Sequence, residues 1–350
     1  VLLLAIFLAD PGLLLTTVLP LAFAAVCTLG TLSIMGRPAG PSVLVLPAII
    51  VGMGAAYPLL MVRGCQRYQQ FDHPDAAAIR TAVFLAAVST LVGSAVLLTA
   101  DHDIFKTAGW ISFLGSGYCL AGTLLILPPL LKRRFKMESA ESGSIDRRFR
   151  NMAPYPRMVA RHKQRSDPLL DELATLVPQE TAMANILDVG CGYGVPACWL
   201  ADRYPTATIH GIEPHTERLR VATLALGNRA RIVEGVAPDL PPMDVLVDLA
   251  IMLDVSHCLQ DWEMEKTLER IHERLLPGGR LIMRSLLPPP AWPHWTRHLA
   301  KIHLQIEGIQ ACYRDQETIS AILSKCGFEV HTSRASGNRG DAHWHVAEPR

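Results

Sequence analysis

The chain has 350 residues, enough for two domains, and its formal net charge of +1 gives no reason to expect a nucleic-acid partner. Its eight cysteines form no CxxC pair, so we expect reduced thiols, no structural zinc site and no bound metal. Of the 33 basic and 32 acidic side chains, only ten lie within residues 1–131. Because a soluble domain must solvate its surface, this distribution predicts a membrane part followed by a soluble part.

Four apolar segments come first in the chain, at residues 13–34, 43–62, 81–99 and 107–131. Each has the ~20 residues that a helix needs to cross a hydrocarbon core of ~30 Å. Helices buried in a soluble protein are the weaker alternative, because four such runs follow one another. Residues 1–9 are too short to span and predict the tail of a fifth helix. The chain begins with Val and has no basic segment there, so we expect no signal peptide and either a truncated product or an unusual start codon.

Basic residues gather in alternate loops between these segments. Three arginines flank the loop at residues 64–80, and four basic residues follow the last span, whereas the other loops carry one each. The positive-inside rule then places residues 64–80 and everything after residue 131 in the cytoplasm. The sequence therefore predicts a multi-pass protein of a bacterial-type inner membrane.

The order of these spans resembles the C-terminal part of resistance–nodulation–division exporters, particularly their lipid-exporting (MMPL-type) branch. The matching features lie at residues 46–54, 78–82, 89–93 and 127–131. The resemblance implies an all-α transmembrane helical bundle over residues 1–135, with the remaining half of an exporter as a partner. Ala56 stands where that family often carries a proton-coupling aspartate, which argues against transport by this chain alone.

A linker is expected at residues 136–165. It opens with a stretch rich in Glu, Ser and Gly, which predicts flexibility, and continues with seven basic residues between positions 147 and 165. These basic residues either contact anionic lipid headgroups or form a solvated helix face. A third interpretation is a lead-in helix around residues 155–157 that covers a bound cofactor.

Short β-branched runs alternate with helical patterns from residue 184 onward. Strands are predicted at residues 185–189, 208–213, 231–234, 245–253, 280–285, 328–332 and 343–347. Helices are predicted at residues 195–204, 217–226, 262–276 and 315–326. This alternation predicts an α/β Rossmann-like fold, with a seven-stranded, mostly parallel sheet covered on both faces.

A glycine loop follows the first of these strands, with the sequence Asp188-Val189-Gly190-Cys191-Gly192-Tyr193-Gly194. Ligands of such folds bind at the carboxyl ends of the strands, where glycine lets the backbone come close. Glu213 ends the second strand and can accept hydrogen bonds from ribose hydroxyls. The loop spacing differs from the dinucleotide pattern G-x-G-x-x-G. It therefore favours S-adenosylmethionine, whose cationic end suits the carboxylate of Asp188, over a nicotinamide dinucleotide.

The soluble half resembles class I S-adenosylmethionine-dependent methyltransferases. Residues 186–194, 210–214, 253–257 and 275–281 resemble four motifs of that family in order. The resemblance covers residues 166–350 and implies S-adenosylmethionine as the cofactor. The residues that it assigns to cofactor binding are Asp188, Gly190, Cys191, Gly192, Tyr193, Gly194, Glu213 and Asp254. Val236 and Ala237 stand where the family often has an acidic residue for the adenine amino group.

Methyl transfer needs alignment above all, and a base only for a poorly ionised acceptor. His257, just past the fourth strand, is the best-placed catalytic base, and the alternative is that it only packs its loop. Asp254 is either a cofactor residue or the N-cap of a turn. The insertion at residues 288–310 carries an apolar helical face, which predicts a substrate lid, an interfacial membrane helix or a helix packed on the sheet.

The sequence as a whole predicts a membrane-tethered S-adenosylmethionine-dependent methyltransferase, with O-methyl transfer favoured. Its acceptor is expected to be a small apolar, phenolic or lipid-like molecule linked to an export pathway. Two alternatives stay open: an exporter component whose methyltransferase-like domain is accessory or regulatory, and a nicotinamide oxidoreductase, which the loop spacing disfavours.

Overall fold

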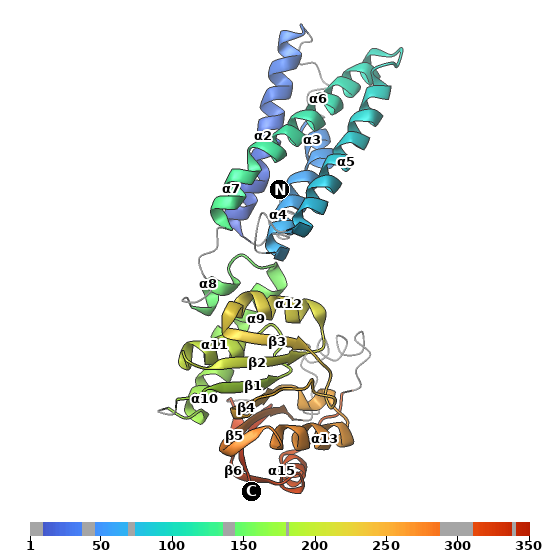
Figure 1. Cartoon of the computed structure of the whole chain (residues 1–350). Coiled ribbons are helices and arrows are strands. Elements are labelled where there is room, and N and C mark those ends of the chain that lie inside the picture. The colour runs from blue at the N-terminus through green and yellow to red at the C-terminus, as the bar shows by residue number, and fades with distance from the viewer. Residues whose placement is uncertain are drawn as a thin grey trace. The chain divides into compact units, whose positions relative to one another are not determined.

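The computed structural model describes residues 10–36, 46–68, 74–135, 144–179, 182–287, 311–337 and 341–350 (Figure 1). The chain divides into two compact units. The first comprises Val1–Glu138 and Asn151–Tyr155, and the second comprises Ser139–Arg150 and Pro156–Arg350. The helix tail expected at residues 1–9 and the insertion expected at residues 288–310 lie outside the described residues.

The described part of the first unit is helical. Its helices are α2 (Pro11–Ile34), α3 (Leu46–Gly54), α4 (Ala56–Tyr68), α5 (Pro74–Leu97), α6 (Asp103–Leu125) and α7 (Leu127–Arg134). Asp10 caps α2 by accepting a hydrogen bond from the backbone N–H of Leu13 at 3.0 Å, and it pairs with Arg134 at 2.9 Å. Helices α2 and α5 both pack along α6.

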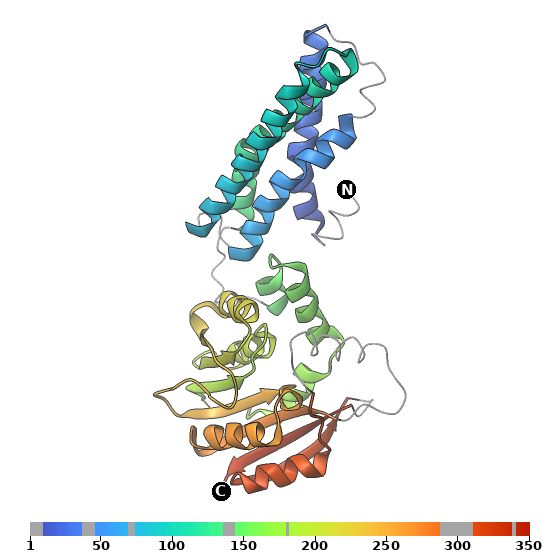
Figure 2. The same ribbon diagram turned by 90° about the vertical axis from the view of Figure 1, so that its right-hand side faces the viewer.

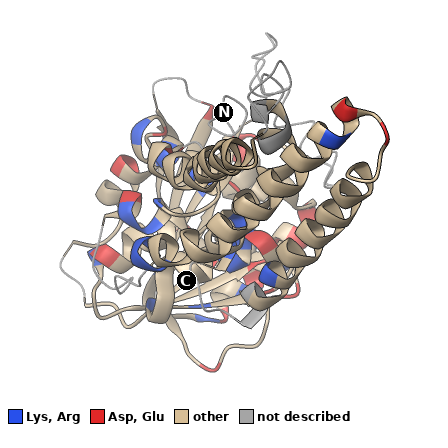
Figure 3. Ribbon diagram, turned by 90° about the horizontal axis from the view of Figure 1, so that it is seen from above, with Lys and Arg blue, Asp and Glu red and all other residues tan. Residues whose placement is uncertain are grey.

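Among the described residues of this unit, three helical segments are long and apolar enough to cross a membrane, judged by length and composition. They are Pro11–Ile34, Ala77–Leu97 and Asp103–Arg134. The long helices of the first unit show few charged positions when seen from above (Figure 3). Three of the four spans expected from the sequence therefore correspond to helices with the length and composition of a membrane crossing.

The expectation of one continuous helix over residues 43–62 is wrong, because the chain there forms two helices that are interrupted at Ala55. Pro58 explains the break. Its nitrogen has no hydrogen to donate to the carbonyl of Gly54, four residues earlier, and its ring crowds that carbonyl. The Gly54 carbonyl instead accepts a hydrogen bond from the thiol of Cys119 on α6, with 3.3 Å between sulfur and oxygen.

Three further helices lie between α7 and the first strand in the described part of the chain: α8 (Ile145–Phe149), α9 (Pro154–Arg165) and α10 (Leu169–Leu176). Residues of α9 from Pro156 onward belong to the second compact unit. Pro156 and Ala160 are buried while Met158 is 58% exposed, so α9 turns one face toward the protein and the other toward solvent.

A seven-stranded sheet forms the centre of the second unit (Figure 2). Its strands are β1 (Asn185–Val189), β2 (Thr208–Glu213), β3 (Ala230–Glu234), β4 (Val247–Leu253), β5 (Leu275–Leu286), β6 (Phe328–Ser336) and β7 (Ala342–Pro349). The order is β3-β2-β1-β4-β5-β7-β6, and β7 runs antiparallel to both of its neighbours while the other pairs are parallel. The mostly parallel sheet expected from the sequence is confirmed. Its strand order reverses between β1 and β4, where such folds bind ligands.

Helices α11 (Val195–Arg203), α12 (Thr216–Leu226), α13 (Asp261–His272) and α15 (Gln316–Lys325) pack on this sheet. The apolar faces of α13 and α15 join β4 and β5 in one core cluster. Both helices, orange and red in Figure 2, lie beside one another there.

The helix expected at residues 262–276 ends earlier, at His272, and Leu275 already begins β5. Leu275 lies four residues after Ile271, so its apolar spacing also suits a helix. In the structure Leu275 pairs with Val247, and the next pair joins Leu249 to Arg280, so the residues between form an irregular bulge in the strand. The turn at Pro277-Gly278-Gly279, which in the sequence looks like the end of the helix, therefore lies within β5 and does not terminate α13.

Candidate functional site

The glycine loop is anchored on β2 by its own backbone. The N–H groups of Gly190 and Cys191 both donate to the carbonyl of Ile212, at 2.8 and 3.1 Å. Gly190 has a φ of 75°, and a Cβ atom placed there would lie 2.4 Å from Cγ2 of Val255. A side chain at this position would be both strained and obstructed, so the close packing of β1 against the end of β4 requires glycine.

Gly192 lies at the tip of the glycine loop and leaves open space beside the backbone. Its φ is 57°, and a Cβ atom there would meet nothing within 4 Å. Its N–H donates to Oε2 of Glu213 at 2.8 Å, and Oε1 of Glu213 accepts from the N–H of His215 at 3.1 Å. The Glu213 carboxylate is thereby fixed at the carboxyl end of β2, beside an open stretch of backbone that a ligand can approach.

Asp188 lies in β1 with only 2% of its surface exposed. Within the described part of the chain, its Oδ2 atom is buried and has no hydrogen-bond partner. Burial raises the pKa of this carboxyl to about 7. The negative charge of Glu213 adds to the rise, and the ammonium of Lys163 opposes it. A cationic ligand group at Oδ2 would supply the missing partner.

Asp254 follows β4 and has a φ of 58°, a left-handed conformation that is uncommon for a residue with a side chain. Its Oδ2 contacts Nζ of Lys163 at 3.2 Å and a guanidinium nitrogen of Arg284 at 3.3 Å. Its Oδ1 is buried, and no described residue donates to it. The sequence left two interpretations of Asp254, a cofactor residue and the N-cap of a turn. In the structure, its carboxylate is paired with cations and caps no described helix.

His257 is buried, and its ring stacks on Tyr313 with 5.6 Å between centroids and 4° between planes. The backbone N–H of Cys312 donates to the His257 carbonyl at 2.7 Å. Burial lowers the pKa of the imidazole, and Asp254 opposes this change. Nδ1 has no hydrogen-bond partner among the residues that the structure describes. The imidazole is therefore neutral near pH 7 and can accept a proton.

The predicted site residues come together at the carboxyl ends of β1, β2 and β4, with one qualification. The thiol of Cys191 is buried and packs beside Gly211, where a Cβ atom would lie 3.1 Å from the sulfur. Burial raises the pKa of this thiol, so it stays protonated. Cys191 therefore serves the packing of the loop on β2. Tyr193 lies in the same loop with a half-buried side chain, and Gly194 caps α11 with a φ of 78°.

Sequence reasoning missed three residues that shape this site: Lys163, Arg284 and Tyr313. Lys163 belongs to the basic stretch that the sequence shows, but its partner Asp254 is 91 positions away. The position of Arg284 in the sequence could have indicated a role at the site, because a charged residue near the carboxyl end of a central strand faces the ligand edge of the sheet. Tyr313 follows the residues outside the described ranges and carries no local motif.

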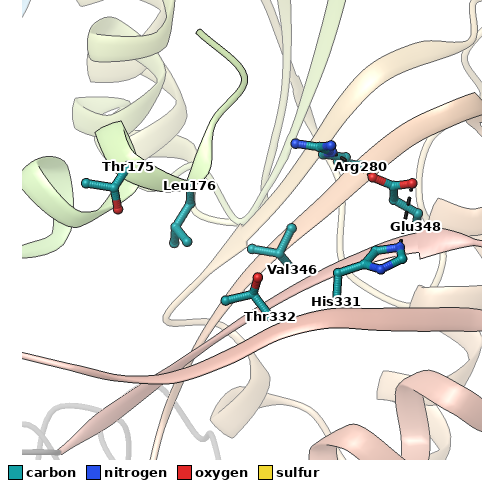
Figure 4. A pocket seen from close by; sticks show the side chains of 7 residues that line it. All are labelled: Thr175, Leu176, Arg280, His331, Thr332, Val346 and Glu348. Atoms are coloured by element: carbon teal, nitrogen blue, oxygen red, sulfur yellow. Dashed lines mark hydrogen bonds and ion pairs between the residues drawn. The ribbon is translucent and has the colours of Figure 1, made fainter.

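A separate surface pocket of about 440 Å³ lies near the opposite ends of the strands (Figure 4). Figure 4 shows the Glu348 carboxylate beside Arg280 and His331, whose side-chain nitrogens lie 2.7 and 3.6 Å from its oxygens. By strand register, Arg280 pairs with Leu249 near the start of β4, whereas Asp254 follows its end. No residue of the glycine loop lines this pocket.

Residues 186–279 match the family described as "Methyltransferase domain". A demethylmenaquinone methyltransferase of Thermus thermophilus is 32% identical over 171 residues, which make up 43% of this chain and 77% of that protein. A fatty-acid O-methyltransferase of Mycolicibacterium smegmatis is 30% identical over 129 residues, which make up 35% of this chain and 44% of that protein. The chain thus spans less than half the length of the fatty-acid enzyme.

Among solved structures, that of a SAM-dependent methyltransferase from Aquifex aeolicus matches with a TM-score of 0.44 and 14% identity. The match covers 60% of this chain and all of that chain (100%).

Proposed function

Because this chain belongs to the S-adenosylmethionine-dependent methyltransferases, we propose that it is a membrane-tethered enzyme that methylates a small apolar, phenolic or lipid-like acceptor. The observation that carries the proposal is the buried, unpartnered Oδ2 of Asp188 beside the open backbone at Gly192. A buried carboxylate oxygen without a partner is costly, and a cationic ligand group removes that cost.

The residues at the ends of β1 and β2 suit the parts of this cofactor. We assign the ribose hydroxyls to Glu213, whose carboxylate is already fixed by two backbone N–H groups. We assign the cationic amino-acid end to Asp188, and the loop backbone at Gly192 to close approach along the ligand. When bound, the cofactor supplies the methyl group, and the protein supplies orientation and charge.

His257 is the proposed base for an acceptor that is weakly acidic. A phenol has a pKa of about 10 and must lose its proton as it is methylated, whereas a fatty-acid carboxyl with a pKa of about 4 is ionised at neutral pH. The neutral, buried imidazole with its unpartnered Nδ1 suits the first case. The name of one relative, a fatty-acid O-methyltransferase, supports O-methyl transfer.

Membrane tethering is supported by the three apolar helical segments of the first unit. With the positive-inside rule, the basic residues at 132–134 favour a methyltransferase domain in the cytoplasm of a bacterial-type cell, attached to the inner membrane. The resemblance of residues 1–135 to an exporter supports an acceptor that belongs to an export pathway, with the remaining half of an exporter as a partner. Residues 136–165 are the proposed connection, and residues 166–350 form the enzymatic domain.

The test uses the full chain reconstituted in lipid nanodiscs with S-adenosylmethionine labelled in the methyl group. Label should pass to a long-chain phenol or a fatty acid. Asp188→Ala and Glu213→Ala should each weaken cofactor binding by about 10- to 100-fold, the worth of a hydrogen bond to a charged group. Glu348→Gln, at the opposite ends of the strands, is the matched control and should change nothing.

Two results would count against the proposed enzyme, and a third would count against its membrane tethering. One is retained cofactor affinity in both alanine variants, which would put the site elsewhere. The other is the absence of transfer to any acceptor together with substrate efflux from proteoliposomes, which would favour an exporter component with an accessory domain. Extraction of the chain from membranes by alkaline carbonate would contradict membrane tethering.

A further inference from the structure

Asp254 adopts a backbone conformation that needs support. It is the one non-glycine residue with positive φ in the described part of the chain. Aspartate tolerates this region better than most residues, but the conformation still costs free energy and persists only where the surroundings enforce it. The residue stands directly after β4, next to the loop that carries His257, so its conformation sets the shape of the site.

Arg284 on β5 contacts Asp254 in two ways. Its carbonyl accepts a hydrogen bond from the Asp254 N–H at 2.9 Å, and its guanidinium contacts Asp254 Oδ2 at 3.3 Å. The first contact fixes the backbone of the turn, and the second fixes the direction of the carboxylate. Arg284 is 7% exposed, so solvent screens this ion pair little.

The Arg284 side chain is itself held rigidly. Its guanidinium pairs with Asp167, just before α10, at 3.0 Å, and its Nε donates to Oγ of Ser336 at 3.1 Å. The guanidinium carbon lies 5.7 Å from the centre of the Trp344 ring. A planar guanidinium with several fixed partners on different elements has one orientation, which a flexible lysine ammonium lacks.

The two oxygens of the Asp254 carboxylate lie in different environments. Oδ2 forms ion pairs with both Arg284 and Lys163. The Nζ atom of Lys163 lies 3.2 Å from Oδ2, and the Lys163 side chain is 23% exposed. Oδ1 is buried, and no described residue donates to it. With Oδ2 held by two cations, Oδ1 presents an acceptor of fixed position at the ligand-binding end of β4.

We propose that Arg284 is a positioning residue, which holds Asp254 in its left-handed turn so that Oδ1 accepts a hydrogen bond from the bound cofactor. The inference rests on the proposed function, since the ligand is the one assigned to this site. The competing explanation is that Arg284 only stabilises the packing of α10 and β6 beside β5, through its contacts with Asp167 and Ser336. The two explanations differ in whether Arg284 acts through Asp254.

A double-mutant cycle on the full chain separates them. Calorimetry measures the dissociation constant of S-adenosylhomocysteine for wild type, Arg284→Gln, Asp254→Asn and the double variant. Each single variant should weaken binding about tenfold, and the double variant should bind within about twofold of Asp254→Asn alone. Arg284→Lys should recover part of the loss. Arg280→Gln, which removes a paired arginine at the other end of the same strand, should leave binding unchanged.

Additive losses, about a hundredfold in the double variant, would overturn the proposal and leave Arg284 a structural residue. Unchanged affinity in Asp254→Asn would also overturn it, and this variant tolerates the turn because asparagine accepts positive φ. If Arg284→Gln fails to fold, Arg284→Lys takes its place in the cycle. If wild type itself does not bind S-adenosylhomocysteine, the proposed function falls first and this inference falls with it.

Discussion

Raising the pH from 6 to 8 should tighten the binding of S-adenosylhomocysteine to this chain, because the ammonium group of the ligand needs the ionised form of Asp188. Burial raises the pKa of this carboxyl to about 7, with Glu213 adding to the rise and Lys163 opposing it. At pH 6 most molecules carry a neutral Asp188, which must lose its proton before it can pair with a cation. The ligand is chosen because it keeps the amino-acid end of the cofactor.

The size of the effect follows from linkage between proton and ligand binding. For one carboxyl that must be ionised, the apparent dissociation constant is multiplied by 1 + 10^(pKa − pH). With the pKa of Asp188 at about 7, this factor is about 11 at pH 6 and about 1.1 at pH 8. Affinity should therefore rise about tenfold over two pH units, with the change centred on pH 7 and nearly complete by pH 8.

Calorimetry on the purified full chain at five pH values provides the assay. Heats measured in buffers of different ionisation enthalpy should also show about one proton released per ligand bound at pH 6, and almost none at pH 8. Asp188→Asn is the matched control, because it keeps the shape of the side chain but cannot ionise. Any pH dependence that it retains belongs to the ligand or to other groups. A flat profile in wild type, or the same profile in Asp188→Asn, would refute this reasoning.

Three further predictions concern the scaffold and the base. Gly190→Ala should lower the melting temperature by several degrees and abolish ligand binding, because its Cβ would stand 2.4 Å from Val255; full retention of both would contradict the packing argument. His257→Gln should lower kcat for a phenol by about 100- to 10,000-fold with unchanged S-adenosylhomocysteine affinity, and equal loss with a fatty-acid acceptor would exclude a role as base. Glu172→Gln weakens hydrogen bonds from Ser336, Gly337 and Trp344, so urea unfolding should show a loss of about 2 kcal/mol.

The parts of the fold that sequence reasoning predicted well are those with local causes. Gly190 and Gly192 lie between a β-branched run and a helical pattern, and their positive φ angles meet the need for a tight strand-to-helix turn. Glu213 was recognisable as a cofactor-binding residue because it ends the second strand, which pairs with β1. In both cases the sequence neighbours that create the signal are also the neighbours that create the structure.

The break at Ala55 shows a local cause that hydropathy does not detect. Residues 43–62 are apolar enough to predict a span, and Pro58 lies inside it. A proline interrupts helical hydrogen bonding four residues before itself, which leaves the Gly54 carbonyl without its helical donor and agrees with the break at Ala55. Prolines also occur inside continuous membrane helices, as Pro20 does in α2. Proline position alone therefore could not decide between a kink and two helices.

The ion pairs of the site could not be predicted, because their partners lie far apart in the chain. Asp254 meets Lys163 from 91 residues before it and Arg284 from 30 residues after it. A lone aspartate after a strand resembles an N-cap, since the local pattern is the same. Its left-handed conformation is set by β5 and α9, which reach it only once the sheet and its lead-in helix have assembled.

Three of the buried atoms that lack a hydrogen-bond partner in the described part of the chain gather at the site, and two of them are carboxylate oxygens. Asp188 Oδ2, Asp254 Oδ1 and His257 Nδ1 are each buried without a hydrogen-bond partner among the described residues, and they come from the ends of β1 and β4. Glu172, in contrast, is a carboxylate whose oxygens accept three hydrogen bonds that join α10 to β6 and β7. A carboxylate used for stability has its partners within the protein, whereas one used for binding must keep an oxygen for the ligand. Among the described residues, the two buried carboxylate oxygens without a partner both lie at the sheet switch point, and the strained turn at Asp254 lies at the same place.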